Sequence, residues 1–201
     1  MSVGPAPVDA WPDGPTTSAG EASQPLLGTV TGEPPQGSDD WHWQLALHTL
    51  AAGAELPATP GEPGQITSLD APLQLHQHDG RSRALLRLQI AHMQMADRAL
   101  ATESTRVVSL HIRDGVAAEL IARPLQGPML LTAGARWMTW LLAGRAEVQW
   151  GDARWPLPVD RPMWLPDDAA RRLRIDGGGE VLLLKIDARG VDPLSLDTLA
   201  D

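Results

Sequence analysis

The sequence predicts an all-β protein built as two tandem β-barrel lobes, and three observations support this prediction. Short runs in which apolar and polar residues alternate recur from Trp41 onward, as in strands with one buried face. Pairs of Asp and Gly interrupt several of these runs, as in β-hairpins. A weak internal repeat places two similar units one after the other. Strands this short, with frequent turns between them, are typical of barrels and sandwiches.

The alternating runs and turns define the expected elements in order. They are strand 41–48, strand 73–75, the turn Asp79-Gly80, strand 84–90, strand 108–112, the turn Asp114-Gly115, strand 146–150, the turn Gly151-Asp152, strand 173–175 and strand 181–186. Residues 91–101 fit helix and strand equally well. Residues 116–123 have helix-compatible content, but they follow a hairpin turn, so we expect a strand there. Gly177–Gly179 is expected to connect two strands.

The internal repeat suggests where the two lobes lie. Residues 66–72 and 138–144 begin 72 residues apart, and each leads into an alternating strand and a turn of Asp and Gly. We expect a first lobe over residues 41–125 and a second over residues 126–190. Residues 1–40, rich in Pro and Gly, form an arm that packs on the barrel, and residues 191–201 form a tail.

Composition and charge exclude several classes of function. The net charge is −9, with no basic footprint of the kind that a nucleic-acid-binding protein needs. The absence of cysteine excludes disulfides, thiolate ligands and a cysteine nucleophile. No apolar run is long enough to cross a membrane and the first residues do not form a secretory signal, so we expect a cytoplasmic protein. Because the eight Trp are the only aromatic residues, they must supply much of the core.

Three stretches, in order, resemble the HutD family of histidine-utilisation proteins, also called Ves. They are Trp11–Thr17, Trp43–Leu47 with the turn Pro60-Gly61, and Val108–Gly115 followed by Glu119–Ile121. The resemblance extends over roughly residues 10–187. It implies a bicupin, that is, two cupin-like β-barrels in tandem, that binds a small molecule linked to histidine degradation and acts as a regulator. Pro12, Asp13, Gln44 and Ile121 stand where the family has Lys, Asn, Arg and Asn.

A binding pocket is expected where the family motifs meet. The candidate ligand-binding residues are Trp11, Asp13, Thr16, Thr17, Trp43, Gln44 and Glu119. Trp11 is a large side chain in a segment of small residues, and burying it favours order in residues 10–18. Composition favours disorder in residues 1–8. The expected ligand is a small molecule, with a histidine catabolite the first candidate, and a homodimer is compatible with the sequence.

His76 and His78 form the one His-x-His pair, which is the arrangement that metal-binding cupins use. Such a site also needs a Glu a few residues later, and none follows His78. Since Leu73 and Leu75 are expected inside, the two imidazoles should point to the solvated face. The same alternation puts His42, His48 and His111 on the polar sides of their strands. We therefore expect no metal and no cofactor.

The leading functional hypothesis is a HutD-like, non-enzymatic small-molecule binder with a regulatory role. No nucleophile–base pair and no phosphate-binding loop is recognisable in the sequence. The first alternative is a metal-dependent cupin enzyme, an isomerase or dioxygenase that uses His76 and His78. The second is a degenerate bicupin that acts only as a structural or interaction partner.

Overall fold

The computed structural model describes residues 5–7, 26–28, 41–57, 64–94, 96–113, 116–166 and 173–187, and all regular structure in these segments is β-strand. The prediction of an all-β chain is therefore confirmed. The strands are β1 (Ala6–Pro7), β2 (Leu26–Gly28), β3 (Trp43–Leu50), β4 (Gly64–Ser68), β5 (Leu73–His76), β6 (Ser82–Leu85), β7 (Ala91–Met93), β8 (Arg98–Ala101), β9 (Thr105–Ile112), β10 (Ala117–Gln126), β11 (Met129–Leu130), β12 (Ala135–Trp150), β13 (Ala153–Pro156), β14 (Pro162–Trp164) and β15 (Leu173–Asp187).

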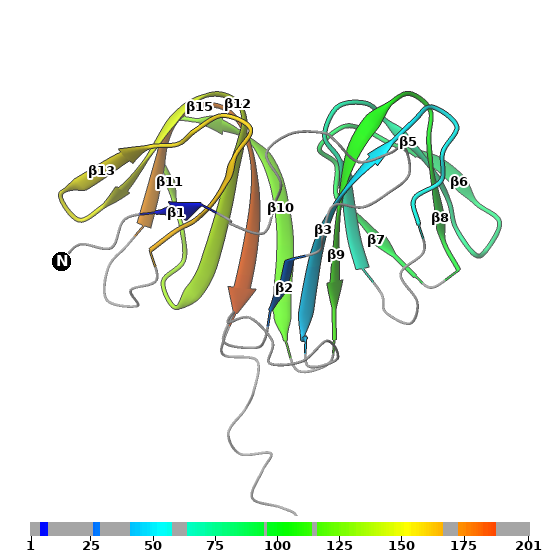
Figure 1. The fold of residues 1–201 in the computed structure, drawn as a ribbon, viewed down its shortest axis with the longest axis horizontal. Coiled ribbons are helices and arrows are strands. Elements are labelled where there is room, and N and C mark those ends of the chain that lie inside the picture. Colours follow the sequence, from blue (N-terminus) through cyan, green and yellow to red (C-terminus); the bar gives the residue numbers. More distant parts are fainter. Residues whose placement is uncertain are drawn as a thin grey trace, which may run out of the picture.

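The strands form three sheets, none of which closes on itself. Sheet A has the order β1-β14-β12-β15-β10, with β11 on β15 and β13 on β12. Sheet B has the order β2-β3-β9-β4-β7, and sheet C has the order β6-β5-β8. In Figure 1, sheet A occupies one side of the molecule and sheets B and C the other. Where the two sides meet, β10 of sheet A contacts β4 and β9 of sheet B.

Two of the three predicted hairpins are confirmed. β5 pairs with β6 around Asp79-Gly80, and β12 pairs with β13 around Gly151-Asp152. The third expected hairpin, between residues 108–112 and 116–123, is wrong because β9 and β10 do not pair with each other; its turn, residues 114–115, lies outside the described residues. β9 already pairs with β3 on one edge and β4 on the other, so β10 has no edge of β9 to join and pairs with β15 instead. Residues 91–93 and 98–101, where helix and strand were both open, are strands.

A glycine corner bends the two longest strands of sheet A. Gly177–Gly179 was expected to connect two strands, but these glycines lie inside the continuous strand β15. A Cβ on Gly179 would lie 1.9 Å from the carbonyl oxygen of Ala143, and one on Gly144 would lie 2.1 Å from that of Gly178. Because only glycine permits such close approach, β12 and β15 can bend together. Sheet A therefore curls around its own core (Figure 1).

Three apolar cores fill the spaces around these sheets. The first joins sheet A to sheet B and contains Trp43 and Trp140. The second lies inside the curl of sheet A and contains Trp137 and Trp150. The third lies between sheets B and C and contains Leu50. Sheet B is thus covered on both faces, so its strands have no fully solvated side.

Two short pieces of the N-terminal arm pair with the sheets. Ala6 and Pro7 pair with β14, and Leu26–Gly28 pairs with β3. The prediction that residues 1–8 are disordered is therefore wrong for Ala6 and Pro7. The reason is that their backbone meets an edge of β14 that has no other strand on it among the described residues. Composition does not reveal such an available edge.

Candidate functional site

The face of sheet B that looks toward sheet C carries a set of polar side chains. We call it the inner face. Its residues follow from the pairing register in three rows: Gln44, His111, Gly64 and Met93, then Ala46, Ser109, Ile66 and Ala91, then His48, Val107 and Ser68. Directly paired residues point to the same side of a sheet. Ile66, Ala91 and Val107 belong to the core between sheets B and C, which fixes the direction of this face.

His48 and Ser109 form the buried centre of the inner face. His48 Nε2 lies 2.9 Å from Ser109 Oγ, and only 4% of His48 is exposed. Burial, and to a smaller extent the nearby His111, lower the pKa of His48 from 6.5 to about 4. Burial acts this way because a low-dielectric surrounding disfavours the charged imidazolium. His48 is therefore a neutral imidazole at neutral pH, with one donor and one acceptor nitrogen.

Gly64 makes room for the ring of His111 on the neighbouring strand. A Cβ at position 64 would lie 2.9 Å from His111 Nδ1 and 2.9 Å from the carbonyl oxygen of Leu110. His111 is buried, whereas Gln44 and Met93 in the same row are half-buried. This row is thus the more accessible end of the inner face. Gln44 is the polar side chain of this row that is only half-buried.

The prediction that His48 and His111 lie on solvated faces is wrong, because both are buried. The alternation itself was identified correctly, with Leu45 and Leu110 in the core against sheet A. The opposite face adjoins the core shared with sheet C and not water. One signal in the sequence pointed the other way: residues 107–110 contain no charged side chain, as in strands that are buried on both faces.

The structure separates the predicted pocket residues that it describes. Trp43 faces the core between sheets A and B, where its ring meets that of Trp164 edge-on at 6.0 Å. Gln44 points to the opposite side and joins the inner face. Glu119 is exposed on β10, paired with Lys185 of β15 in sheet A. Trp11, Asp13, Thr16 and Thr17 lie outside the described residues.

The His-x-His pair lies at the β5–β6 hairpin and points outward as predicted. His76 Nδ1 lies 2.7 Å from Ser82 Oγ. The backbone N–H of His78 donates to Asp97 Oδ1 at 2.9 Å. Both histidines are exposed, whereas Leu73 and Leu75, which point to the opposite face of the strand, are fully buried. Across the described segments, no three His, Asp or Glu side chains are grouped so that they could hold a metal ion.

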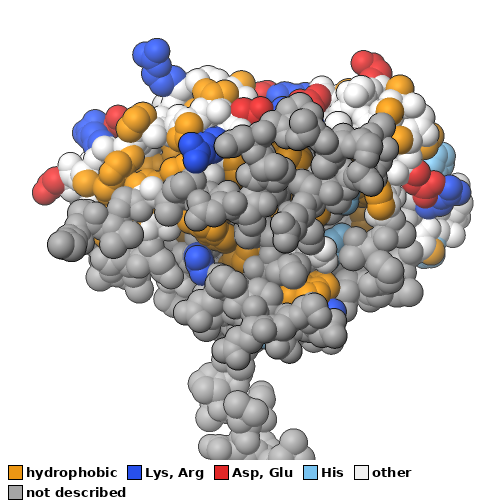
Figure 2. Space-filling view, viewed as in Figure 1, with side chains coloured by type: hydrophobic (Ala, Val, Ile, Leu, Met, Phe, Trp, Pro, Cys, Tyr) orange, Lys and Arg blue, Asp and Glu red, His pale blue; other side chains and the backbone are white. Residues whose placement is uncertain are grey.

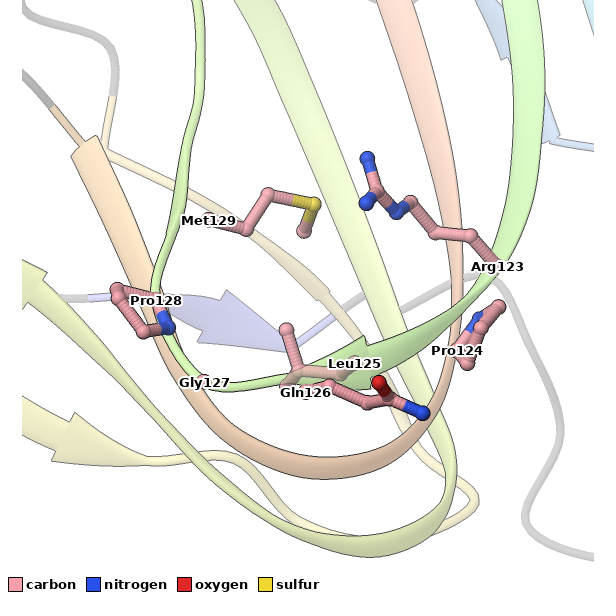
Figure 3. A pocket seen from close by; sticks show the side chains of 7 residues that line it. All are labelled: Arg123, Pro124, Leu125, Gln126, Gly127, Pro128 and Met129. Carbon is pink, nitrogen blue, oxygen red and sulfur yellow. The ribbon is translucent and has the colours of Figure 1, made fainter.

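A hollow of about 240 Å³ lies at the end of β10, lined by residues 123–129. Figure 3 shows the side chains of Arg123 and Met129 pointing toward one another across it. Leu125, also part of the core inside the curl of sheet A, is among the lining residues. The hollow lies in sheet A, on other strands than the inner face of sheet B.

The surface visible in Figure 2 carries basic and acidic side chains interspersed along its rim. No basic field stands out among the described residues on this face. The part of the chain that the structure describes also contains no helical stretch with the length and hydrophobicity of a membrane span. Two expectations from the sequence therefore stay predictions: that the protein has no nucleic-acid partner, and that it can form a homodimer.

Comparisons with known proteins show the fold. Neither the protein-family models nor the curated proteins give a match to this chain. Among solved structures, a conserved protein of unknown function from Pseudomonas aeruginosa is 12% identical, with a TM-score of 0.62 over 82% of this chain and 98% of that one. HutD from Pseudomonas fluorescens is 17% identical, with a TM-score of 0.60 over 77% and 84%. A cupin 2 conserved barrel domain protein from Leptotrichia buccalis is 9% identical, with a TM-score of 0.51 over 85% and 90%. The fold is therefore cupin-like, and HutD is among its structural neighbours.

Proposed function

We propose that this chain is a HutD-like, non-enzymatic cytoplasmic protein that binds a small molecule at the inner face of sheet B. The observation that carries the proposal is the buried polar set His48, Ser109 and His111, with Gln44 at its accessible end. Binding sites in proteins are mostly apolar cavities with a few convergent polar groups. The inner face has this composition, because its polar groups adjoin the apolar residues of the core between sheets B and C.

The chemistry of the inner face suits a ligand that both donates and accepts hydrogen bonds. A neutral imidazole and a carboxamide each carry both a hydrogen-bond donor and a hydrogen-bond acceptor. Histidine catabolites carry imidazole, amide or carboxylate groups, and the likeness to HutD directs the proposal to them and to a regulatory role. No described contact favours the metal-dependent alternative, since His76 and His78 are engaged by Ser82 and Asp97 at the exposed hairpin.

We further propose that the two halves are tandem cupin-like lobes. Sheets B and C enclose one core and the curl of sheet A encloses another, which supports two barrels of similar build. In this arrangement β10 belongs to the second lobe and not to the first, which the sequence places over residues 41–125, because β10 pairs along its whole length with β15. The first lobe then carries the ligand and the second supports it through the shared core that contains Trp43 and Trp140.

Thermal shift and calorimetric titration with a panel of histidine catabolites test the binding proposal. At least one catabolite should stabilise the native protein and bind it saturably. Gln44→Ala should weaken that binding by about tenfold or more, a loss of about 1.4 kcal/mol, while leaving the unliganded melting temperature nearly unchanged. Gln149→Ala is the matched control, since Gln149 is likewise a half-buried strand glutamine but belongs to β12.

Two results would count against the proposal. The first is that no catabolite in the panel binds the wild-type chain. The second is that Gln44→Ala and Gln149→Ala bind a catabolite equally well, which would place the ligand away from the inner face of sheet B.

A further inference from the structure

We propose that the hollow formed by residues 123–129 is a second binding site, which takes the carboxylate of a small organic acid and covers part of its hydrocarbon chain. This site is distinct from the inner face of sheet B. The proposal rests on the position of one guanidinium, on the apolar wall opposite it, and on the strand pairing that holds the two together (Figure 3).

Pairing with a single strand fixes both sides of the hollow. Arg123 on β10 pairs with Val181, and Met129 on β11 pairs with Ile175, so both residues are anchored to β15. Between them the chain turns at Gly127, which has a φ of 84° and donates its N–H to the carbonyl oxygen of Gly177 at 2.7 Å. The hollow therefore has a defined backbone before any ligand arrives, which reduces the ordering cost of binding.

The guanidinium of Arg123 is available to an incoming anion. Within the described part of the chain, Arg123 has no hydrogen bond or ion pair. Other arginines are already engaged: Arg87 is held by both carboxylate oxygens of Glu180, and Arg106 by Asp70 and Asp160. A planar guanidinium matches a carboxylate through two parallel N–H···O bonds, so Arg123 offers a ready site for this group.

The wall opposite Arg123 selects for a carbon chain. The apolar side chain of Met129 points toward Arg123 across the hollow, and Leu125 and Pro128 also line it. A strongly hydrated ion such as inorganic phosphate would gain nothing from this wall, whereas an alkyl carboxylate would bury its chain there. The volume of about 240 Å³ corresponds to roughly eight water-sized volumes, so the fitting ligand is a short-chain acid.

Titration of the full chain with butyrate, monitored by backbone amide chemical shifts, tests the proposal. Butyrate should shift the amides of Gly127 and Met129 saturably, in the weak range expected for a small ligand in an open hollow. Arg123→Gln should weaken binding by about tenfold or more, while Arg145→Gln should leave it unchanged. Arg145 is a matched control, because it is exposed on neighbouring β12 and does not line the hollow. The neutral isostere butyramide should bind at least about tenfold more weakly than butyrate.

Several outcomes would overturn the proposal. They are the absence of shifts with butyrate up to its solubility limit, equal binding to the Arg123→Gln protein, equal losses in the Arg123→Gln and Arg145→Gln proteins, and equally tight binding of butyramide or inorganic phosphate. Gln44→Ala should not affect butyrate binding, so failure here and failure at the inner face of sheet B are distinguishable.

Discussion

His48 Nε2 lies 2.9 Å from Ser109 Oγ across neighbouring strands of sheet B, and both side chains are buried. This contact places a titratable group inside a cupin-like core. Within the described residues, the second ring nitrogen of His48 has no hydrogen-bond partner. Protonation of His48 would therefore leave a buried charge with little compensation, which explains why its pKa is lowered to about 4.

Folding stability should fall as the pH falls below the pKa of an unfolded histidine. The unfolded chain binds a proton at His48 with a pKa of 6.5, whereas the folded chain binds it only near 4. The unfolded state thus holds more protons between these values, and stability rises with pH across this window. Denaturant unfolding should show a loss of about 2 kcal/mol between about pH 7 and pH 5.

His48→Gln should remove most of this pH dependence, since the glutamine does not titrate. The range stops at about pH 5 because carboxyl groups titrate below it, near their ordinary pKa of about 4. His76→Gln is the control variant, because it makes the same substitution at an exposed position outside sheet B. An unaltered slope in the His48→Gln protein would show that His48 is not the group responsible.

Arg106 should contribute to stability by bridging the two halves of the molecule. Its guanidinium bonds to Asp70 at 2.9 Å and to Asp160 at 2.7 Å, and it lies 6.0 Å from the ring of Trp140. Asp160 lies in the half formed by sheet A, and Asp70 follows β4 in sheet B. Arg106→Met should lower the free energy of unfolding by about 1–2 kcal/mol, because two carboxylates lose their charged partner. Chemical denaturation measures this loss.

Arg154→Met is the control for the Arg106 measurement. Arg154 pairs with Glu147 at 3.0 Å within sheet A, and its side chain is 61% exposed, against 30% for Arg106. An exposed ion pair contributes less than about 1 kcal/mol, since solvent screens it. Equal losses for the two variants would contradict a bridging role for Arg106.

Gly179 should tolerate no side chain, whereas the adjacent Gly178 should. The φ of Gly179 is 141°, and a Cβ there would lie 1.9 Å from the carbonyl oxygen of Ala143. A Cβ on Gly178 would come no closer than 3.9 Å to the carbonyl oxygen of Leu125. Gly179→Ala should therefore cost more than about 3 kcal/mol or prevent folding, and Gly178→Ala should cost less than about 1 kcal/mol. Thermal unfolding measures the difference, and equal melting temperatures for the two variants would contradict the prediction.

Gln65 should hold β10 against sheet B. Its Oε1 accepts a hydrogen bond from the backbone N–H of Leu120 at 2.8 Å, and the side chain is 7% exposed. Gln65→Leu leaves that N–H buried without an acceptor, which should cost about 1–3 kcal/mol. Gln74→Leu is the control variant. Gln74 is a half-buried residue of β5, so this substitution should lower the free energy of unfolding by less than Gln65→Leu does. Faster hydrogen exchange at Leu120 in the Gln65→Leu protein would report the lost bond directly, and unchanged exchange would refute it.

The sequence by itself determined the class of fold and the local direction of most side chains. Alternation along residues 43–48 and 73–76 placed Leu45, Leu73 and Leu75 correctly in cores, and Asp79-Gly80 and Gly151-Asp152 marked true hairpins. These features depend on neighbours a few residues away. Period-two alternation and turn geometry are local properties, so the chain specifies them before any long-range contact forms.

Only the tertiary structure decided what each face meets and which strands pair at a distance. His48 and His111 are buried on the side of sheet B that alternation alone assigns to water, which is the side that shares a core with sheet C. β10 joins β15 because both edges of β9 are occupied. Gly177–Gly179 bends a strand because the backbone of its partner β12 leaves no room for a Cβ at Gly177 or Gly179. In each case the deciding contact comes from a segment far along the chain, and no local pattern contains that information.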